Sequence, residues 1–139
     1  MRDFVEYLDE IVEPTVADFE ANPTSRRHAF LACVATCHAV DYLIYPRKAT
    51  GTRQKFEKTR RDFKTVDEIG HAFKHVTTGA GPEACRKATD VISRPPGTVG
   101  NFAVGLSRIG DGVGGVTPST ETSEDILKAL RCALAFLRR

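Results

Sequence analysis

The chain has 139 residues, of which 41% are hydrophobic and 27% charged, and its formal net charge is +2. This composition is typical of a globular protein long enough to bury its own core, so we expect residues 1–139 to form a single domain. No apolar run reaches the roughly 18 residues that cross a bilayer, which argues against a membrane protein. The first residues are acidic and lack the pattern of a secretory signal, so we expect a cytoplasmic protein.

The charges are distributed unevenly along the chain. Residues 1–25 carry seven acids and one base, whereas residues 47–64 carry eight bases and two acids. We expect these segments to neutralise each other, within the fold or across a symmetric dimer. Alternatively the basic segment faces a polyanion such as a nucleic acid. Its single aromatic residue, Phe56, is too little for the stacking platform of a single-strand binder, so nucleic acid is the less favoured partner.

Two helices are predicted in the first third of the chain. Apolar residues at helical spacing indicate a helix over 3–19, which Pro14 should kink or split because proline lacks an amide hydrogen. The second helix should begin after an N-cap at Thr24 or Ser25 and end at Tyr45, before Pro46.

The second helix contains the most informative feature of the sequence. Residues 30–45 are apolar on nearly every helical face, which is typical of a helix buried on all sides. Asp41 would then enter the protein interior, where a carboxylate is costly unless it is paired or hydrogen-bonded. Its candidate partners come from elsewhere in the chain: Arg27, Arg61, His71, Lys74 and His75.

Further helices are expected in the middle and at the end of the chain. A weakly amphipathic segment spans 53–63, and capping-box spacing from Thr65 to Glu68 opens a fresh helix that runs to Val76. Its apolar face is formed by Val66, Ile69, Phe73 and Val76, with Gly70 permitting close approach. The last helix should begin at Thr122 or Ser123 and run to Leu137.

The segment between these helices is rich in glycine. Alternating apolar residues predict a strand over 101–109, and 113–117 can return antiparallel after the glycine turn at 110–112. Val91 and Ile92 can add a short third strand. The whole is therefore expected to be mostly α, an antiparallel bundle of four or five helices around 30–45, with a small β-hairpin insertion at 98–118 before the C-terminal helix.

The candidate binding residues combine histidines with charged groups: His38, Asp41, Arg61, His71, Lys74 and His75. His71 and His75 lie one helical turn apart, and Glu68 lies about one turn earlier, a spacing that can bind a metal. However, the periodicity places these three side chains roughly opposite the apolar face. We therefore favour a polar face, and we expect no metal and no cofactor.

Catalytic motifs are not evident in the sequence. Its four cysteines form no C-x-x-C pair, and Cys33 and Cys37 are expected to be small buried residues. The glycines at 110–115 do not follow the phosphate-loop pattern, and no serine lies in a nucleophile elbow. Whether the protein is an enzyme stays open, with the balance against it.

The segment 67–76, DEIGHAFKHV, follows an apolar helix that ends in DYLI. This arrangement resembles a group of small bacterial proteins that carry an I-x-x-A/H-x-K-H helix, a glycine-rich β segment and a final amphipathic helix. The resemblance covers about residues 24–138 and implies a helical bundle without a known activity.

A more distant likeness is to HEPN-type domains, helical bundles that include RNA-cleaving toxins. Their mark is an arginine followed four to six residues later by a histidine. Arg61-Asp62 is similar to the opening of that motif, but the next histidine is His71, ten positions on.

The favoured function is therefore a non-enzymatic interaction protein that forms a homo-oligomer or binds a protein partner. Two alternatives stay open. One is an RNA-binding or RNA-cleaving domain that uses the basic segment 47–64, and the other is a metal-dependent helical-bundle hydrolase that uses His71 and His75.

Overall fold

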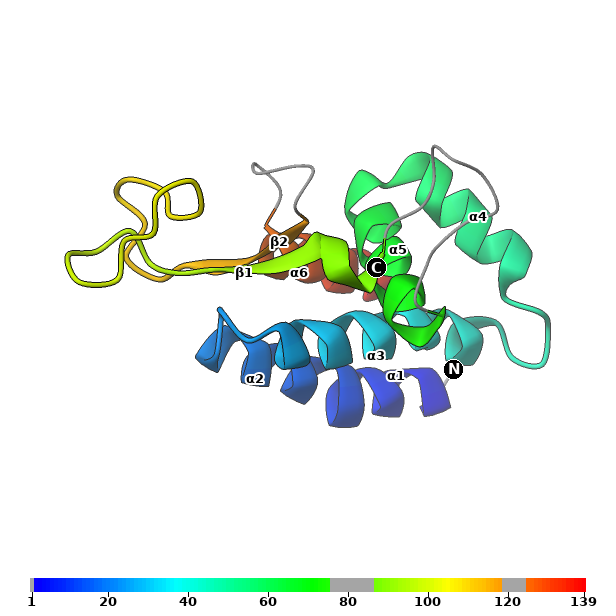
Figure 1. The fold of residues 1–139 in the computed structure, drawn as a ribbon. Helices are drawn as coiled ribbons and strands as arrows, with labels where there is room; N and C mark the ends of the chain where they lie inside the picture. The colour runs from blue at the N-terminus through cyan, green and yellow to red at the C-terminus, as the bar shows by residue number, and fades with distance from the viewer. Residues whose placement is uncertain (1, 76–86, 119–124) are drawn as a thin grey trace.

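The computed structural model describes residues 2–75, 87–118 and 125–139. It is mostly helical, with a two-stranded antiparallel hairpin before the last helix (Figure 1), so the predicted fold class is confirmed. The elements are α1 (Arg2–Tyr7), the π-helical turn η1 (Leu8–Val12), α2 (Glu13–Ala21), α3 (Arg26–Ile44), α4 (Thr50–Thr59), α5 (Arg61–His75), the 3₁₀ turn η2 (Ala88–Asp90), β1 (Val91–Arg94), β2 (Gly115–Pro118) and α6 (Ile126–Leu137).

The first predicted helix is one continuous rod made of α1, η1 and α2. Pro14 lies in the first turn of α2, directly after the π-helical turn. A π turn widens the helix by one residue, which accommodates a proline that cannot donate a backbone hydrogen bond. The rod ends at Ala21, with Asn22 as its C-cap, before Pro23.

Helix α3 is the central element and packs against the rod, α5 and α6. Ser25 caps its N-terminus by accepting a hydrogen bond from the His28 amide at 3.4 Å, and the helix ends at Ile44. However, Leu31 is 48% exposed and Tyr42 is 44% exposed. The prediction that this helix is buried on all sides is therefore wrong, because its neighbours leave one side uncovered.

Helices α4 and α5 meet at Arg60, whose extended backbone (φ −137°, ψ 104°) separates them. The predicted boundary at Thr65 is wrong, since Thr65 lies buried within α5. The expected close approach at Gly70 is confirmed: a Cβ atom there would lie 2.8 Å from the Cys37 sulfur on α3. The largest buried apolar side chains come from all parts of the bundle: Leu8, Val12, Val16, Phe19, Val40, Phe63, Val66, Ile69, Val91, Val116, Ile126 and Leu130.

The hairpin differs from the expected one. Strand β1 pairs with β2, from Val91 opposite Pro118 to Arg94 opposite Gly115, whereas the predicted strand 101–109 belongs to the loop 95–114 that projects from the body (Figure 1). Gly105 interrupts that segment with a left-handed backbone (φ +80°), and its apolar side chains are exposed rather than packed.

The base of loop 95–114 is closed by a buried arginine and a backbone contact. The Arg94 guanidinium forms an ion pair with Asp111 and lies 3.9 Å from Asp125. The Gly97 amide donates a hydrogen bond to the Asp111 carbonyl at 2.6 Å. These contacts therefore join the two ends of the loop to each other and to Asp125 at the start of α6.

Helix α6 begins at Ile126, after an N-cap at Asp125 whose carboxylate accepts hydrogen bonds from the Leu127 and Lys128 amides. The predicted N-caps Thr122 and Ser123 lie outside the described residues, as do Val76 and Cys85.

The acids of the N-terminal rod are paired with α6. Arg131 lies 2.6 Å from Glu13 and also binds Glu20, while Arg138 lies 2.7 Å from Asp9. The expectation that the acidic segment is neutralised within the fold by residues 47–64 is therefore wrong. Within the basic segment, Arg53, Arg60 and Lys64 pair instead with Asp41, Asp62 and Glu68.

Candidate functional site

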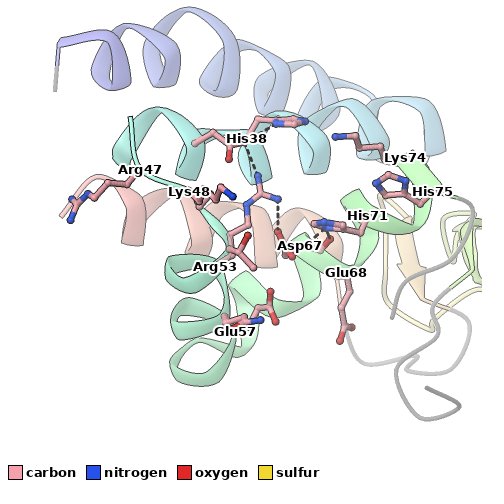
Figure 2. A pocket seen from close by; sticks show the side chains of 14 residues that line it. His38, Arg47, Lys48, Arg53, Glu57, Asp67, Glu68, His71, Lys74 and His75 are labelled. Atoms are coloured by element: carbon pink, nitrogen blue, oxygen red, sulfur yellow. Dashed lines mark hydrogen bonds and ion pairs between the residues drawn. The ribbon is translucent and has the colours of Figure 1, made fainter. Parts of the chain in front are cut away.

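A cavity of about 780 Å³ lies where the end of α3, the following loop and helices α4 and α5 meet (Figure 2). Nearly all of its lining is ionisable. The lining residues are His38, Asp41, Arg47, Lys48, Ala49, Thr50, Arg53, Gln54, Glu57, Asp67, Glu68, His71, Lys74 and His75. A cavity with this lining suits a polar, charged ligand rather than an apolar one.

Arg53 on α4 lies at the centre of the cavity wall. Its Nη2 donates to the Asp41 carboxylate at 2.8 Å and to the Cys37 carbonyl at 3.0 Å. Its Nη1 lies 3.8 Å from Asp67 Oδ1. One guanidinium therefore connects α3, α4 and α5, which the planar fork of arginine allows and a lysine ammonium does not.

Asp41 is held at the surface of this network rather than in the core. Its side chain is 46% exposed, so the prediction that it is buried is wrong, because the side of α3 that carries it is uncovered. Asp41 does have basic partners, as predicted, but they are not the residues that were predicted. Arg53 and His38 bind Asp41, with His38 Nδ1 3.0 Å from Oδ2.

Among the described residues, the buried carboxylate is Asp67 on α5. Its side chain is only 8% exposed. His71 Nδ1 is hydrogen-bonded to the Asp67 backbone carbonyl at 3.1 Å and lies 3.3 Å from the carboxylate Oδ2. The Asp67 Oδ1, like the Nε of Arg53, forms no hydrogen bond within the described part of the chain. Buried polar atoms nearly always have a partner, so these two orphaned atoms in the cavity wall make the cavity a candidate ligand site.

Glu57 on α4 shares the cavity with Asp67. Partial burial, followed by the negative charges of Asp67 and Glu68, raises the pKa of Glu57 above its usual value, while His71 acts in the opposite direction. A third carboxylate charge in this region is disfavoured unless a cation accompanies it.

The outer lining carries cations that the protein itself does not neutralise. Arg47 and Lys48 lie at one end of the cavity and Lys74 at the other, next to His75 (Figure 2). In the described ranges, none of the side chains of Arg47, Lys48 and Lys74 forms a hydrogen bond or ion pair, whereas Asp41, Asp67 and Glu68 all do.

Five of the six candidate binding residues line this one cavity: His38, Asp41, His71, Lys74 and His75. The sixth, Arg61, begins α5 and is not part of the lining. Glu68, His71 and His75 have the sequence spacing of metal ligands. Among residues 2–75, 87–118 and 125–139, no group of three or more histidine, cysteine, aspartate or glutamate side chains is arranged to hold a metal ion.

The sequence interpretation missed Arg53, Glu57 and Asp67. A signal for Asp67 was present, because it lies four residues after the buried Phe63 and three before Gly70, which places it on the packed side of its helix. Arg53 had no comparable signal, since its partners are 12 and 14 residues away in the sequence.

The chain matches no protein-family model, no curated protein and no solved structure. Within the described part, no helix combines the length and hydropathy that a bilayer crossing needs. Cys33 and Cys37 are buried free thiols, as expected, and burial raises the pKa of both.

Proposed function

We propose that the protein binds a small phosphate-bearing ligand in the cavity between α3, α4 and α5, and that it acts by binding rather than by catalysis. One observation carries this proposal. Among the described lining residues, the carboxylates Asp41, Asp67 and Glu68 have basic partners, while the cations Arg47, Lys48 and Lys74 have no acidic ones. The lining carries four acids and four bases, but the unpaired cations lie at its two ends, and these ends favour an anion.

Size and polarity support the same ligand class. About 780 Å³ is within the usual range for small-molecule sites. Arginine and lysine are the usual phosphate-binding side chains. The orphaned Asp67 Oδ1 accepts hydrogen bonds only. The ligand we propose therefore combines a phosphate with a hydroxyl or amine donor, as sugar phosphates do.

The test compares two double variants that remove the same charge. Arg47→Gln with Lys48→Gln removes cations that line the cavity, and Lys55→Gln with Lys58→Gln removes cations of α4 that do not. Calorimetry with ribose 5-phosphate should show affinity reduced about tenfold or more in the first variant and by less than about twofold in the second. Equal losses, or no binding by the unmodified protein, would contradict the proposal.

A second candidate is cleavage of RNA, supported by two histidine–carboxylate pairs in one cavity. His38 Nδ1 is hydrogen-bonded to the Asp41 carboxylate at 3.0 Å. His71 Nδ1 is hydrogen-bonded to the Asp67 backbone carbonyl at 3.1 Å, with the Asp67 carboxylate 3.3 Å away, and such contacts orient a histidine for proton transfer. One histidine would take the proton of a ribose 2′-hydroxyl as its oxygen attacks phosphorus. The other would protonate the departing 5′-oxygen as the P–O bond breaks.

Cleavage of a fluorescent RNA dinucleotide tests this second candidate. His38→Ala and His71→Ala should each reduce the rate about 100-fold or more, while ribose 5-phosphate binding persists. Absence of cleavage by the unmodified protein, with binding intact, rules out the enzyme and leaves the binding protein.

We further propose a cytoplasmic homo-oligomer. Buried free thiols at Cys33 and Cys37 suit a reducing compartment. Loop 95–114 presents large exposed apolar side chains, including Val99, Val104 and Ile109, as association surfaces do. Light scattering at micromolar concentration tests the assembly, and a strict monomer would count against it.

A further inference from the structure

A second, smaller cavity lies next to the first. It has a volume of about 380 Å³ and is lined by Asp3, Asp41, Tyr42 and Tyr45. Asp41 also lines the larger cavity, so the two meet at its side chain. The chain runs directly from Tyr45 through Pro46 to Arg47 and Lys48, which places an aromatic wall beside two unpaired cations of the larger cavity.

The aromatic wall is partly fixed and partly exposed. Tyr42 stacks on Tyr7 with ring centroids 4.1 Å apart and planes 12° apart. The Tyr7 hydroxyl donates to the Ala35 carbonyl at 3.1 Å, so this stack is anchored to α3. Tyr45 is 83% exposed. Exposed aromatic rings beside cations are typical of sites where nucleic-acid bases stack.

The carboxylates of the smaller cavity are not equivalent. Asp41 is already bound by Arg53 and His38, whereas Asp3 has no partner within the described ranges. One available carboxylate accepts hydrogen bonds from the N–H groups of a base. A single available carboxylate also provides little negative charge for a quaternary ammonium group, which would prefer a more anionic aromatic site.

We infer that the two cavities form one site for a nucleoside phosphate, with the base against Tyr45 and Tyr42 and the phosphate at Arg47 and Lys48. This inference rests on the proposed function and names its ligand class. The aromatic platform that the basic segment lacks in sequence is supplied by the end of α3. The ligand is either a free nucleotide or one residue of a single strand, because both present the same base and phosphate.

The test uses three probes that share a phosphate: guanosine monophosphate, ribose 5-phosphate and phosphocholine. Guanosine monophosphate should bind the full chain about tenfold tighter than ribose 5-phosphate, because stacking adds to phosphate binding. Tyr45→Ala should remove this difference and leave ribose 5-phosphate binding unchanged. Tyr45→Phe, which keeps the flat ring, should retain the difference.

The matched control is Phe102→Ala, an exposed aromatic residue on loop 95–114, away from α3 and α4 (Figure 1). It should leave both affinities unchanged. Equal binding of guanosine monophosphate and ribose 5-phosphate, or phosphocholine binding as tight as that of the nucleotide, would overturn the base site while the proposed function stands. Loss of binding to all three probes would remove the proposed function itself.

A single-stranded RNA hexamer separates the two sources of the ligand. Affinity for the hexamer well above that for guanosine monophosphate, with steep dependence on salt, identifies a strand. Equal affinity identifies a free nucleotide. Both results support the nucleoside-phosphate site, provided that Tyr45→Ala weakens each.

Discussion

Arg53 holds together groups that would otherwise repel or remain unbonded. It lies between Asp41 and Asp67 and also binds the Cys37 carbonyl. Its side chain is largely buried, and Asp67 is more so. Removing the cation leaves a buried carboxylate with less compensation, which costs more than losing an exposed ion pair.

We therefore expect Arg53→Ala to lower the free energy of unfolding by about 2–4 kcal/mol, as measured by urea denaturation. Arg47→Ala is the matched control, since it removes an arginine of the same cavity that has no ion pair within the described residues. It should change stability by less than about 0.5 kcal/mol. Similar losses in the two variants would show that Arg53 does not hold the network together.

Glu57 gives a prediction with a defined pH dependence. Burial and the nearby charges of Asp67 and Glu68 raise the pKa of Glu57, so the folded state keeps this proton to higher pH than the unfolded chain does. Its favourable contribution is present at low pH and is lost as the pH rises through the folded-state pKa.

Glu57→Gln should accordingly raise the melting temperature by a few degrees at pH 7.5 and leave it nearly unchanged at pH 4. Scanning calorimetry at both pH values measures this difference. Glu10→Gln, at an exposed position in η1, should show no such dependence. A stabilisation by Glu57→Gln that is equal at both pH values would contradict the electrostatic cause.

At the scale of elements, the packing of α3 on α5 positions the cavity. Gly70 allows the close approach, because a Cβ atom there would lie 2.8 Å from the Cys37 sulfur and 3.3 Å from the Cys33 carbonyl oxygen. In contrast, a Cβ atom at Gly51 on α4 would meet nothing within 4 Å. The two glycines form a matched pair within helices.

Gly70→Ala should destabilise the protein by about 1–3 kcal/mol, because the added methyl group forces the helices apart. Gly51→Ala should instead be neutral or stabilise by up to about 1 kcal/mol, since alanine is the better helix former. Chemical denaturation measures both. An equal gain in both variants would mean that α3 and α5 tolerate a wider separation.

Local signals explain how much of these elements was predictable. Ser25 and Pro46 act within one turn, so the start and end of α3 that they cause were predicted and are confirmed. Pro14 was expected to kink or split the first helix, but it follows a π-helical turn within a continuous rod. The boundary at Arg60 and the partner of β2 depend on what packs nearby. Alternating apolar residues at 101–109 therefore gave a wrong strand, since no neighbouring segment covers them.

The candidate site was only partly predictable for the same reason. His38, Asp41, His71, Lys74 and His75 share one cavity, because their positions on two long helices follow from helical periodicity. Arg53 reaches Asp41 only because α4 packs against α5, which in turn packs on α3. Sequence spacing does not show how α4 packs. The sequence therefore indicated that Asp41 requires a basic partner, but not that this partner is Arg53.

At the scale of the whole molecule, ion pairs join the first and last helical segments. Arg131 binds Glu13 and Glu20. Its hydrogen bonds lower the pKa of Glu20, while the Gly114 and Val113 amides and Arg94 lower the pKa of Asp111 at the base of the loop. Both carboxylates are therefore more acidic in the folded state than in the unfolded chain.

A carboxylate whose pKa is lower in the folded state than in the unfolded chain stabilises the fold at pH values above its unfolded pKa, which is about 4. This stabilisation is lost as the pH falls through the folded-state pKa. The free energy of unfolding should therefore fall steeply below about pH 4. Arg131→Gln should lower stability at pH 7 by about 1 kcal/mol and flatten the fall, whereas Arg139→Gln should do neither. Unchanged acid sensitivity in Arg131→Gln would contradict a role for Glu20.

The closed base of loop 95–114 has a practical consequence. Gly97 and Asp111 are hydrogen-bonded to each other across the base of the loop. A peptide inserted near Gly105 should therefore not disturb the strands β1 and β2 that flank the loop. Such an insertion gives a handle by which the protein is fixed to a sensor surface. Both cavities would then face the solution, away from the attachment point.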